Sequence, residues 1–158
     1  MVIEFAQNIL KLEHANSTEI DPDTPYPVII EMPEFNPLQK GGTMRLGLRK
    51  TLFTSPQCHA TTLYGTSEFI FERHRHRFEF NVKYKKQFEE KGFRFVAQDE
   101  TGTRMEIVEL PVDVHPYFIG VQYHPEFLSR PLSPSPVFKG LVQSSISHSS
   151  SRQIKHNE

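Results

Sequence analysis

The sequence predicts an α/β fold, and three observations support this prediction. Apolar runs of strand length lie between polar segments, as in PVIIEM at 27–32 and YFIGVQYHP at 117–125. Two amphipathic helical patterns occur, VIEFAQNIL at 2–10 and VKYKKQFEEKG at 82–92. The turn sequence DETGT at 99–103 fits a hairpin, so we expect more hairpin pairing than a simple alternation of strands and helices would give.

Composition limits the class of protein. The chain has 158 residues, a net charge of -1 and 23% charged residues, which fits one domain and gives no general attraction to nucleic acid or an anionic membrane. No apolar run approaches the roughly 20 residues that span a bilayer, and no secretory signal is visible at the amino end. Cys58 is the single cysteine and cannot form an internal disulfide. We therefore expect a cytosolic protein.

The first half of the chain predicts four elements in order. A helix over 2–10 is followed by a polar loop that contains prolines, and then by a buried strand over 27–32. A glycine turn leads into a second strand within 41–54, and residues 55–68 suit a loop with a short helical turn. Alternate positions of the second strand are apolar, and we expect these to face inward: Met44, Leu46, Leu48 and Leu52.

The second half predicts a helix, three strands and a closing helix. The charged helix at 82–92 ends at Gly92, a residue type suited to a helix C-terminus. Strands are expected in FRFVAQ at 93–98, RMEIVELP at 104–111 and YFIGVQYHP at 117–125. An apolar pattern from Val137 to Ile146 predicts a closing helix. The domain is expected to occupy 1–147, with a disordered polar tail over 148–158.

The string HPE at 124–126 suggests acid–base chemistry. In extended backbone His124 and Glu126 point to the same side, and Pro125 restricts its own φ and biases His124 toward the extended region. A carboxylate beside an imidazole orients one ring nitrogen and stabilises the imidazolium, which suits a general base that then acts as an acid. A nucleophile is lacking in the string. A plain polar turn is the alternative.

The string FERHRHRFEFN at 71–81 places arginines at every second position. If it is extended, Arg73, Arg75 and Arg77 share one face and could bind a carboxylate. Three interpretations stay open: a solvated charged loop, a site for an anion or substrate, and a nucleic-acid patch. Flanking glutamates offset the local charge and disfavour the last of these: Glu68, Glu72 and Glu79.

Metal binding and cysteine chemistry have weaker support. Candidate metal ligands are present without the tight spacing of a zinc site: His74, His76, His115, His124 and Glu126. Cys58 is followed by His59, but neighbouring residues of a strand face opposite sides, and no glycine-flanked elbow surrounds this cysteine. We expect no bound metal and interpret Cys58 as a structural thiol.

Five segments together resemble one family, the glutaminase domain of CTP synthases, a class I glutamine amidotransferase. They are, in order, NSTE at 16–19, GGTMRLG at 41–47, ERHRHRFEFN at 72–81, MEIVELP at 105–111 and HPYFIGVQYHPEF at 115–127. The tyrosine–histidine–proline–glutamate–phenylalanine string indicates class I glutaminases in general. The ERHRHR and GGTMRLG strings are particular to CTP synthases. The resemblance covers most of residues 2–140 and implies a flavodoxin-like fold.

The resemblance also implies roles for four residues. In this family a cysteine thiolate attacks the side-chain amide of glutamine, releases ammonia and leaves a thioester that water hydrolyses. His124 and Glu126 correspond to the histidine and glutamate of the triad. Glu19 corresponds to the glutamine-binding glutamate and Arg77 to the glutamine-binding arginine.

The sequence departs from the family pattern at its amino end. The nucleophilic cysteine of the family lies in a Gly-x-Cys-x-Gly elbow before the helix that here begins at Val2, so we expect a partial domain that lacks this elbow and the first strands. The synthase domain of the family, which binds UTP, ATP and Mg²⁺ for pyrimidine synthesis, has no counterpart in this sequence. The resemblance implies that the parent enzyme is a tetramer. The expectation is a CTP synthase fragment that is inactive alone. The alternative is a short isoform that acts as an interaction or regulatory module with full-length CTP synthase.

Overall fold

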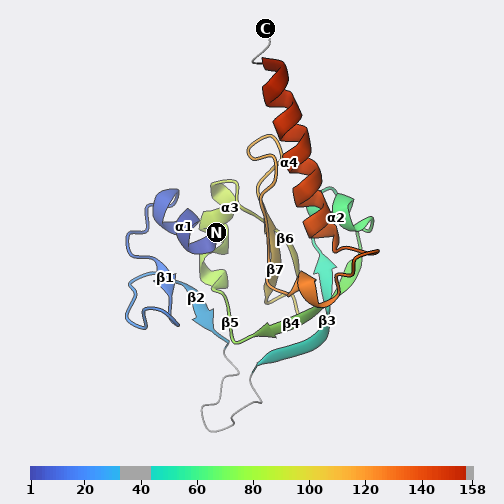
Figure 1. Cartoon of the computed structure of the whole chain (residues 1–158). Helices are drawn as coiled ribbons and strands as arrows, with labels where there is room; N and C mark the ends of the chain where they lie inside the picture. Colours follow the sequence, from blue (N-terminus) through green and yellow to red (C-terminus); the bar gives the residue numbers. More distant parts are fainter. Residues whose placement is uncertain (33–43, 156–158) are drawn as a thin grey trace.

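A computed structural model describes residues 1–32 and 44–155 and confirms the α/β class (Figure 1). The helical elements are α1 (Val2–Asn8), α2 (His59–Tyr64), η1 (Val82–Tyr84), α3 (Lys85–Glu90), η2 (Pro125–Phe127) and α4 (Pro136–Lys155). The strands are β1 (Asn16–Ser17), β2 (Pro27–Glu31), β3 (Arg45–Phe53), β4 (Phe69–His76), β5 (Phe78–Phe80), β6 (Arg94–Asp99), β7 (Met105–Glu109) and β8 (Ile119–Val121). Each strand predicted from the sequence is present over its described residues.

Antiparallel pairing dominates the larger sheet, and β6 and β7 form a hairpin at the predicted turn sequence. The larger sheet has the strand order β4-β3-β6-β7-β8, and all its neighbouring pairs are antiparallel. The smaller sheet has the order β1-β2-β5 and contains one parallel pair, β1 with β2. The DETGT segment forms the turn between β6 and β7, with Gly102 at φ 75. The described residues thus form an α/β arrangement in which most strand pairs are antiparallel.

Two apolar clusters cover opposite faces of β6 and β7. One contains Phe5 of α1, Phe88 of α3 and Phe95 of β6. The other contains Ala60 of α2 and alternate residues of the same two strands, Val96 and Ile107. Figure 1 shows the corresponding layers, with α1 and α3 on one side of β6 and β7 and α2 on the other. This two-sided burial explains the nearly continuous apolar character of β6.

The prediction that the leucines of β3 face inward is wrong. Leu46 is 44% exposed and Leu48 is 52% exposed. The opposite face of the strand is covered instead, because Thr51 is fully buried and Arg45 and Thr51 both bond to the carboxylate of Glu106 on β7. Alternation identified a strand correctly, but the polar residues determine which face is inward.

The closing helix is longer than predicted. Helix α4 continues to Lys155, so residues 148–155, expected as part of a disordered tail, are helical. Figure 1 shows that α4 packs near α2 at its first turns and then projects beyond the body of the domain. Adding residues to an existing helix is much easier than starting one, which explains how a serine-rich segment continues the helix. The rest of the predicted tail, 156–158, lies outside the described residues.

Across the described part of the chain, no helix is both long enough and apolar enough to cross a membrane.

Candidate functional site

His124 and Glu126 are in direct contact. The distance from His124 Nδ1 to Glu126 Oε1 is 2.7 Å, and the two side chains are 38% and 54% exposed. The sequence prediction that these groups share one side is therefore confirmed. The conformation differs in one respect, because only His124 is extended and residues 125–127 form the 3-10 turn η2.

The backbone around His124 fixes where the imidazole lies. The His124 N–H donates to the Arg73 carbonyl at 2.9 Å, which ties the end of the β8 segment to β4. Pro125 occupies the first turn of η2, where its fixed φ is compatible with the helix. The His124 ring stacks on Phe127, with centroids 4.8 Å apart and an interplanar angle of 22°. The imidazole is thus positioned by the backbone on one side and an aromatic ring on the other.

The contact with Glu126 selects one tautomer of His124. A carboxylate can only accept, so the Nδ1 that faces it carries the proton. The backbone N–H of Glu126 and then the His124 ring hold the pKa of the Glu126 carboxyl below its usual range, which keeps it ionised. The Nε2 atom of neutral His124 is then an acceptor. The pair is arranged as a base with a carboxylate partner.

A cavity of about 540 Å³ brings Glu19 and Arg77 together. Glu19 lies in the turn after β1, where its N–H donates to Ser17 Oγ, and Arg77 lies in the bend between β4 and β5. Arg75 and Gln122 line the same cavity, and Gln122 is two residues before His124. The structure therefore places an acid and a guanidinium at one cavity near the histidine–glutamate pair. Sequence reasoning did not include Gln122.

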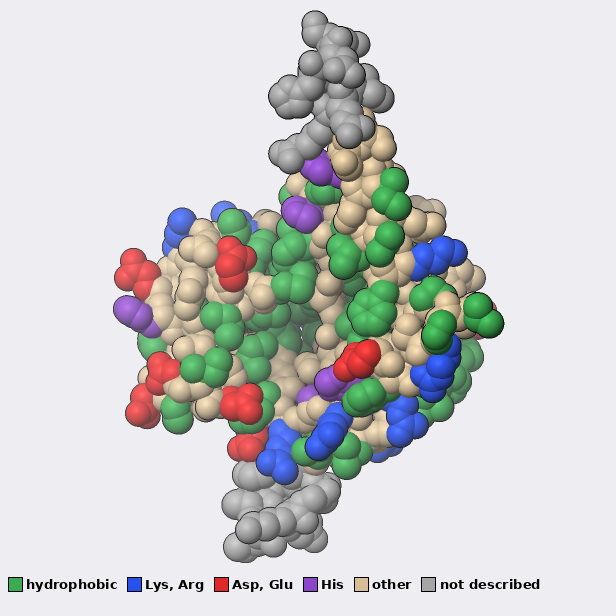
Figure 2. Space-filling model, viewed as in Figure 1, with side chains coloured by type: hydrophobic (Ala, Val, Ile, Leu, Met, Phe, Trp, Pro, Cys, Tyr) green, Lys and Arg blue, Asp and Glu red, His purple; other side chains and the backbone are tan. Residues whose placement is uncertain are grey.

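The arginine string is extended and presents a basic face. Arg73 and Arg75 of β4 are exposed, whereas Glu72 and His74, which alternate with them, are buried. Figure 2 shows basic side chains gathered over the region of β3 and β4, with histidine and acidic side chains beside them. Two of the glutamates expected to offset this charge point inward instead, because Glu72 and Glu79 are buried.

Beneath the cavity lies a buried polar network that the sequence did not reveal. His76 Nδ1 is 3.0 Å from the Phe78 carbonyl, and His76 Nε2 is 3.2 Å from His74 Nδ1. His74 Nε2 lies 3.7 Å from Glu106 Oε1, which accepts from Arg45 at 2.6 Å. The sequence pattern placed the arginines on one face but did not assign an inward position to the histidines, and no local signal identified a partner on β7.

The hydrogen bonds of this network determine both histidine tautomers. Burial lowers the pKa of His76 to about 4, so the ring is neutral at neutral pH and its Nδ1–H donates to the Phe78 carbonyl. Its Nε2 must then accept from His74 Nδ1–H. Burial also lowers the pKa of His74 to about 3, which leaves His74 Nε2 as an acceptor facing the Glu106 carboxylate. This contact is not an ion pair at neutral pH.

Cys58 has the structural role expected for it. It is buried at the N-cap of α2, where its Sγ accepts from the Thr61 N–H at 3.4 Å. Its neighbour His59 instead directs its backbone N–H to Glu109. Within the ranges 1–32 and 44–155, no group of three or more histidine, cysteine, aspartate or glutamate side chains is arranged to hold a metal ion.

Comparison with known proteins agrees with the geometry. The family model for glutamine amidotransferase class-I matches residues 1–144. CTP synthase 1 of Danio rerio is 59% identical over 141 residues, which are 89% of this chain and 24% of that protein. CTP synthase 1 of Homo sapiens is 57% identical over 145 residues, 92% of this chain and 24% of that protein. The chain thus spans about a quarter of the length of these relatives.

A solved structure gives the same result at the level of the fold. The glutaminase domain of CTPS from Trypanosoma brucei, solved with bound acivicin, aligns with a TM-score of 0.81 and 30% sequence identity. The alignment covers 91% of this chain and 55% of that one. The chain therefore belongs to the class I glutamine amidotransferase family, and both its sequence and its fold are similar to the glutaminase domain of CTP synthases.

Proposed function

We propose that this chain forms part of a glutaminase site that supplies ammonia for CTP synthesis. The observation that carries the proposal is the single cavity shared by Glu19 and Arg77, close to the His124–Glu126 pair. The similarity to CTP synthases over about nine tenths of the chain supports it. The parent reaction would be the ATP-dependent amination of UTP in the cytosol, in a homotetramer whose synthase domain binds both nucleotides.

The proposed substrate contacts follow from the charges of free glutamine. Its α-carboxylate needs a cation, and Arg77 can offer two parallel N–H donors from its guanidinium. Its α-ammonium needs an acceptor, and the Glu19 carboxylate lies at the same cavity. The side-chain amide would then extend toward the segment that includes Gln122 and His124.

The proposed proton transfers use the tautomer set by Glu126. His124 Nε2 accepts the proton of a cysteine thiol, and the resulting thiolate attacks the amide carbon of glutamine. The imidazolium, stabilised by Glu126, returns its proton to the departing nitrogen, and ammonia leaves. Water then adds to the thioester with His124 again as the base, which releases glutamate and regenerates the thiol.

The nucleophile in this proposal is not Cys58. That thiol is buried in the apolar cluster beside α2 and caps the helix, so a substrate in the cavity cannot reach it without unfolding of α2. We propose that the nucleophile belongs to polypeptide outside these 158 residues. The purified chain alone would then release no ammonia from glutamine.

An ammonia-release assay tests these roles in the polypeptide that includes the upstream coding sequence of the same transcript. His124→Ala is expected to lower kcat about 10²- to 10⁴-fold, the usual contribution of a general base. Arg77→Ala is expected to raise the KM for glutamine about 10- to 100-fold, because a charged hydrogen bond to the carboxylate is lost. Cys58→Ser should leave both constants unchanged.

Arg73→Ala is the matched control for Arg77. Arg73 is exposed on the same string but does not line the cavity of Glu19 and Arg77. An equal rise in KM for the two variants would show that the cavity is not the glutamine site. Ammonia release by the 158-residue chain alone would disprove the assignment of the nucleophile.

A further inference from the structure

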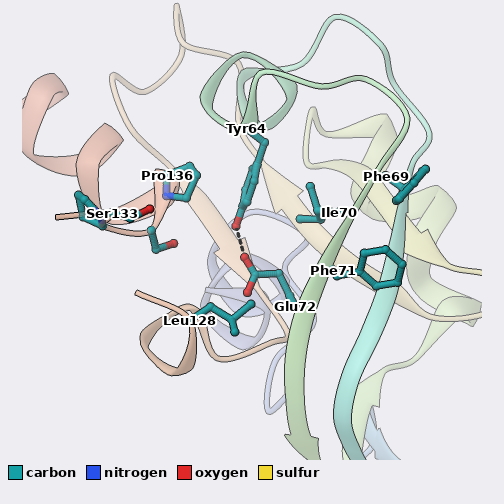
Figure 3. A pocket seen from close by; sticks show the side chains of 10 residues that line it. Tyr64, Phe69, Ile70, Phe71, Glu72, Leu128, Ser133 and Pro136 are labelled. Carbon is teal, nitrogen blue, oxygen red and sulfur yellow. Dashed lines mark hydrogen bonds between the residues drawn. The ribbon is translucent and has the colours of Figure 1, made fainter. Parts of the chain in front are cut away.

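A second cavity, of about 440 Å³, lies between β4 and the segment that leads into α4. Figure 3 shows Tyr64 of α2, Ile70 and Glu72 of β4, and Leu128 and Pro136 around it. Ile70 is 8% exposed and Leu128 is 41% exposed, so one apolar wall is buried and the other is partly open to solvent. The volume is within the roughly 300–1,000 Å³ of small-molecule sites.

Two buried polar atoms at this cavity lack hydrogen bonds. Glu72 is 4% exposed and its Oε2 has no partner among the described residues, whereas its Oε1 accepts from the Tyr64 hydroxyl at 2.9 Å. Ser135 is 6% exposed and its Oγ makes no hydrogen bond of normal geometry, although it lies near enough to lower the pKa of Tyr64. Leaving a buried polar atom unpaired costs stability, so a partner is expected at each.

The hydrogen bonds already present define what the missing partner must offer. The single proton of the Tyr64 hydroxyl goes to Glu72, so the Tyr123 hydroxyl, 2.8 Å away, donates to Tyr64. Glu72 Oε2 therefore remains as an acceptor on a carboxylate that faces the cavity. Burial raises the pKa of Glu72 by more than the Tyr64 hydrogen bond lowers it. No cation contributes to this pKa, so the charge of the buried carboxylate is not compensated by a described residue.

Simpler occupants match these features less well. A water molecule takes up about 30 Å³, so one water would satisfy the polar atoms but leave most of the apolar volume empty. A metal ion would need more ligands than one carboxylate and one hydroxyl provide. A guanidinium binds best to both oxygens of a carboxylate, and Oε1 is already used by Tyr64.

We propose that this cavity binds a primary ammonium group carried on a short aliphatic chain. One N–H donates to Glu72 Oε2 and a second to Ser135 Oγ. The aliphatic chain lies against Ile70, Leu128 and Pro136, where its burial adds to affinity in proportion to the apolar area removed from water. The site is distinct from the cavity of Glu19 and Arg77, because the two have no lining residue in common.

Saturation-transfer NMR with the full chain and n-butylammonium chloride tests the proposal. Saturable binding is expected, and n-butanol, which has the same chain without the charge, should bind about tenfold more weakly or worse. Glu72→Gln should weaken n-butylammonium binding about 10- to 100-fold, and Ser135→Ala about 2- to 10-fold. Glu68→Gln is the matched control, because Glu68 is exposed just before β4 and does not line the cavity.

Three outcomes would overturn the proposal: no saturable binding, equal binding of n-butanol, or unchanged binding by Glu72→Gln. A crystal soaked with n-butylammonium chloride provides a measurement that does not depend on the folding of any variant. Density for the nitrogen within hydrogen-bond distance of Glu72 Oε2 supports the site. The soak uses n-butylammonium at a concentration that saturates the NMR signal. Density for water alone at Glu72 Oε2 under this condition contradicts the proposal.

Discussion

The described part of the protein contains two histidine–glutamate pairs, one inside the larger sheet and one in the segment that follows β8. They differ in distance, in sequence separation and in exposure. His124 and Glu126 are 2.7 Å apart, come from one short string and are substantially exposed. His74 and Glu106 are 3.7 Å apart, come from β4 and β7, and have side chains that are 0% and 1% exposed. The same two residue types thus form one accessible pair and one inaccessible pair.

The two glutamates have opposite pKa shifts because their surroundings differ. The carboxyl of Glu126 has a lowered pKa because its own backbone N–H and the His124 ring stabilise the ionised form. Burial raises the pKa of Glu106, although the Thr51 hydroxyl and the Arg45 guanidinium oppose it. The exposed pair is accessible to solvent, whereas Glu106 of the buried pair connects β7 to β3 through Arg45 and Thr51.

Replacing Glu106 and Glu126 in turn should distinguish the two pairs. The larger loss in the free energy of unfolding is expected at the buried Glu106. Glu106→Gln removes the charge that Arg45 faces inside the protein, and we expect the free energy of unfolding to fall by about 3 kcal/mol, as for other broken buried pairs. Glu126→Gln should leave the free energy of unfolding unchanged within error, because its side chain is solvated. Urea denaturation of the two variants beside the parent chain measures both effects.

The reverse order of effects would contradict this assignment. If Glu126→Gln destabilised the protein more than Glu106→Gln, the exposed pair would be the structural one. A double variant in which Arg45→Met accompanies Glu106→Leu is a useful control, because removing both charges can cost much less than removing one.

The sequence could predict the exposed pair but not the buried one. A proline between His124 and Glu126 and a spacing of two residues are local signals that predicted the contact, although the bond to Arg73 and the stacking on Phe127 also position the imidazole. The partner of His74 depends on how β3 and β7 pair with their neighbours, which no local pattern encodes. Glu72 has the same explanation, because its inward direction follows from the register of β4 against β3.

The leucines of β3 also show that a local pattern does not reveal tertiary contacts. Alternation of Leu46 and Leu48 correctly predicted a strand, but it could not tell which face the rest of the domain covers. The buried carboxylate of Glu106 recruits Arg45 and Thr51, so the polar face of β3 is the inner one. Pattern reasoning fails here because a satisfied ion pair replaces apolar burial.

The buried histidines predict a pH dependence of stability of intermediate size. His74 and His76 have pKa values lowered to about 3 and about 4 by burial, whereas an unfolded histidine titrates near 6.5. Between pH 6.5 and 4 the unfolded chain binds protons that the folded chain does not, so stability rises with pH and is lost as pH falls. We expect His74 to contribute about 1 kcal/mol per pH unit in this window.

Urea denaturation at several pH values between 7 and 5 checks this slope. His74→Gln removes one of the two groups, so the free energy of unfolding of the variant should fall less steeply with decreasing pH than that of the parent chain. Parallel curves for the two proteins would show that His74 is not held neutral by the fold.

The smallest expected effect concerns Pro125, which lies between His124 and Glu126. Pro125 restricts the unfolded chain and biases His124 toward the extended conformation, so Pro125→Ala should lower the free energy of unfolding by about 1 kcal/mol. Pro131→Ala, in the exposed loop that follows, is the control for the general loss of a proline. If local chain stiffness holds His124 Nδ1 against Glu126, only Pro125→Ala should loosen that contact, as seen in a crystal structure or by NMR of the imidazole. An unchanged contact in Pro125→Ala would mean that the bond to Arg73 and the stacking on Phe127 position the imidazole without help from the proline.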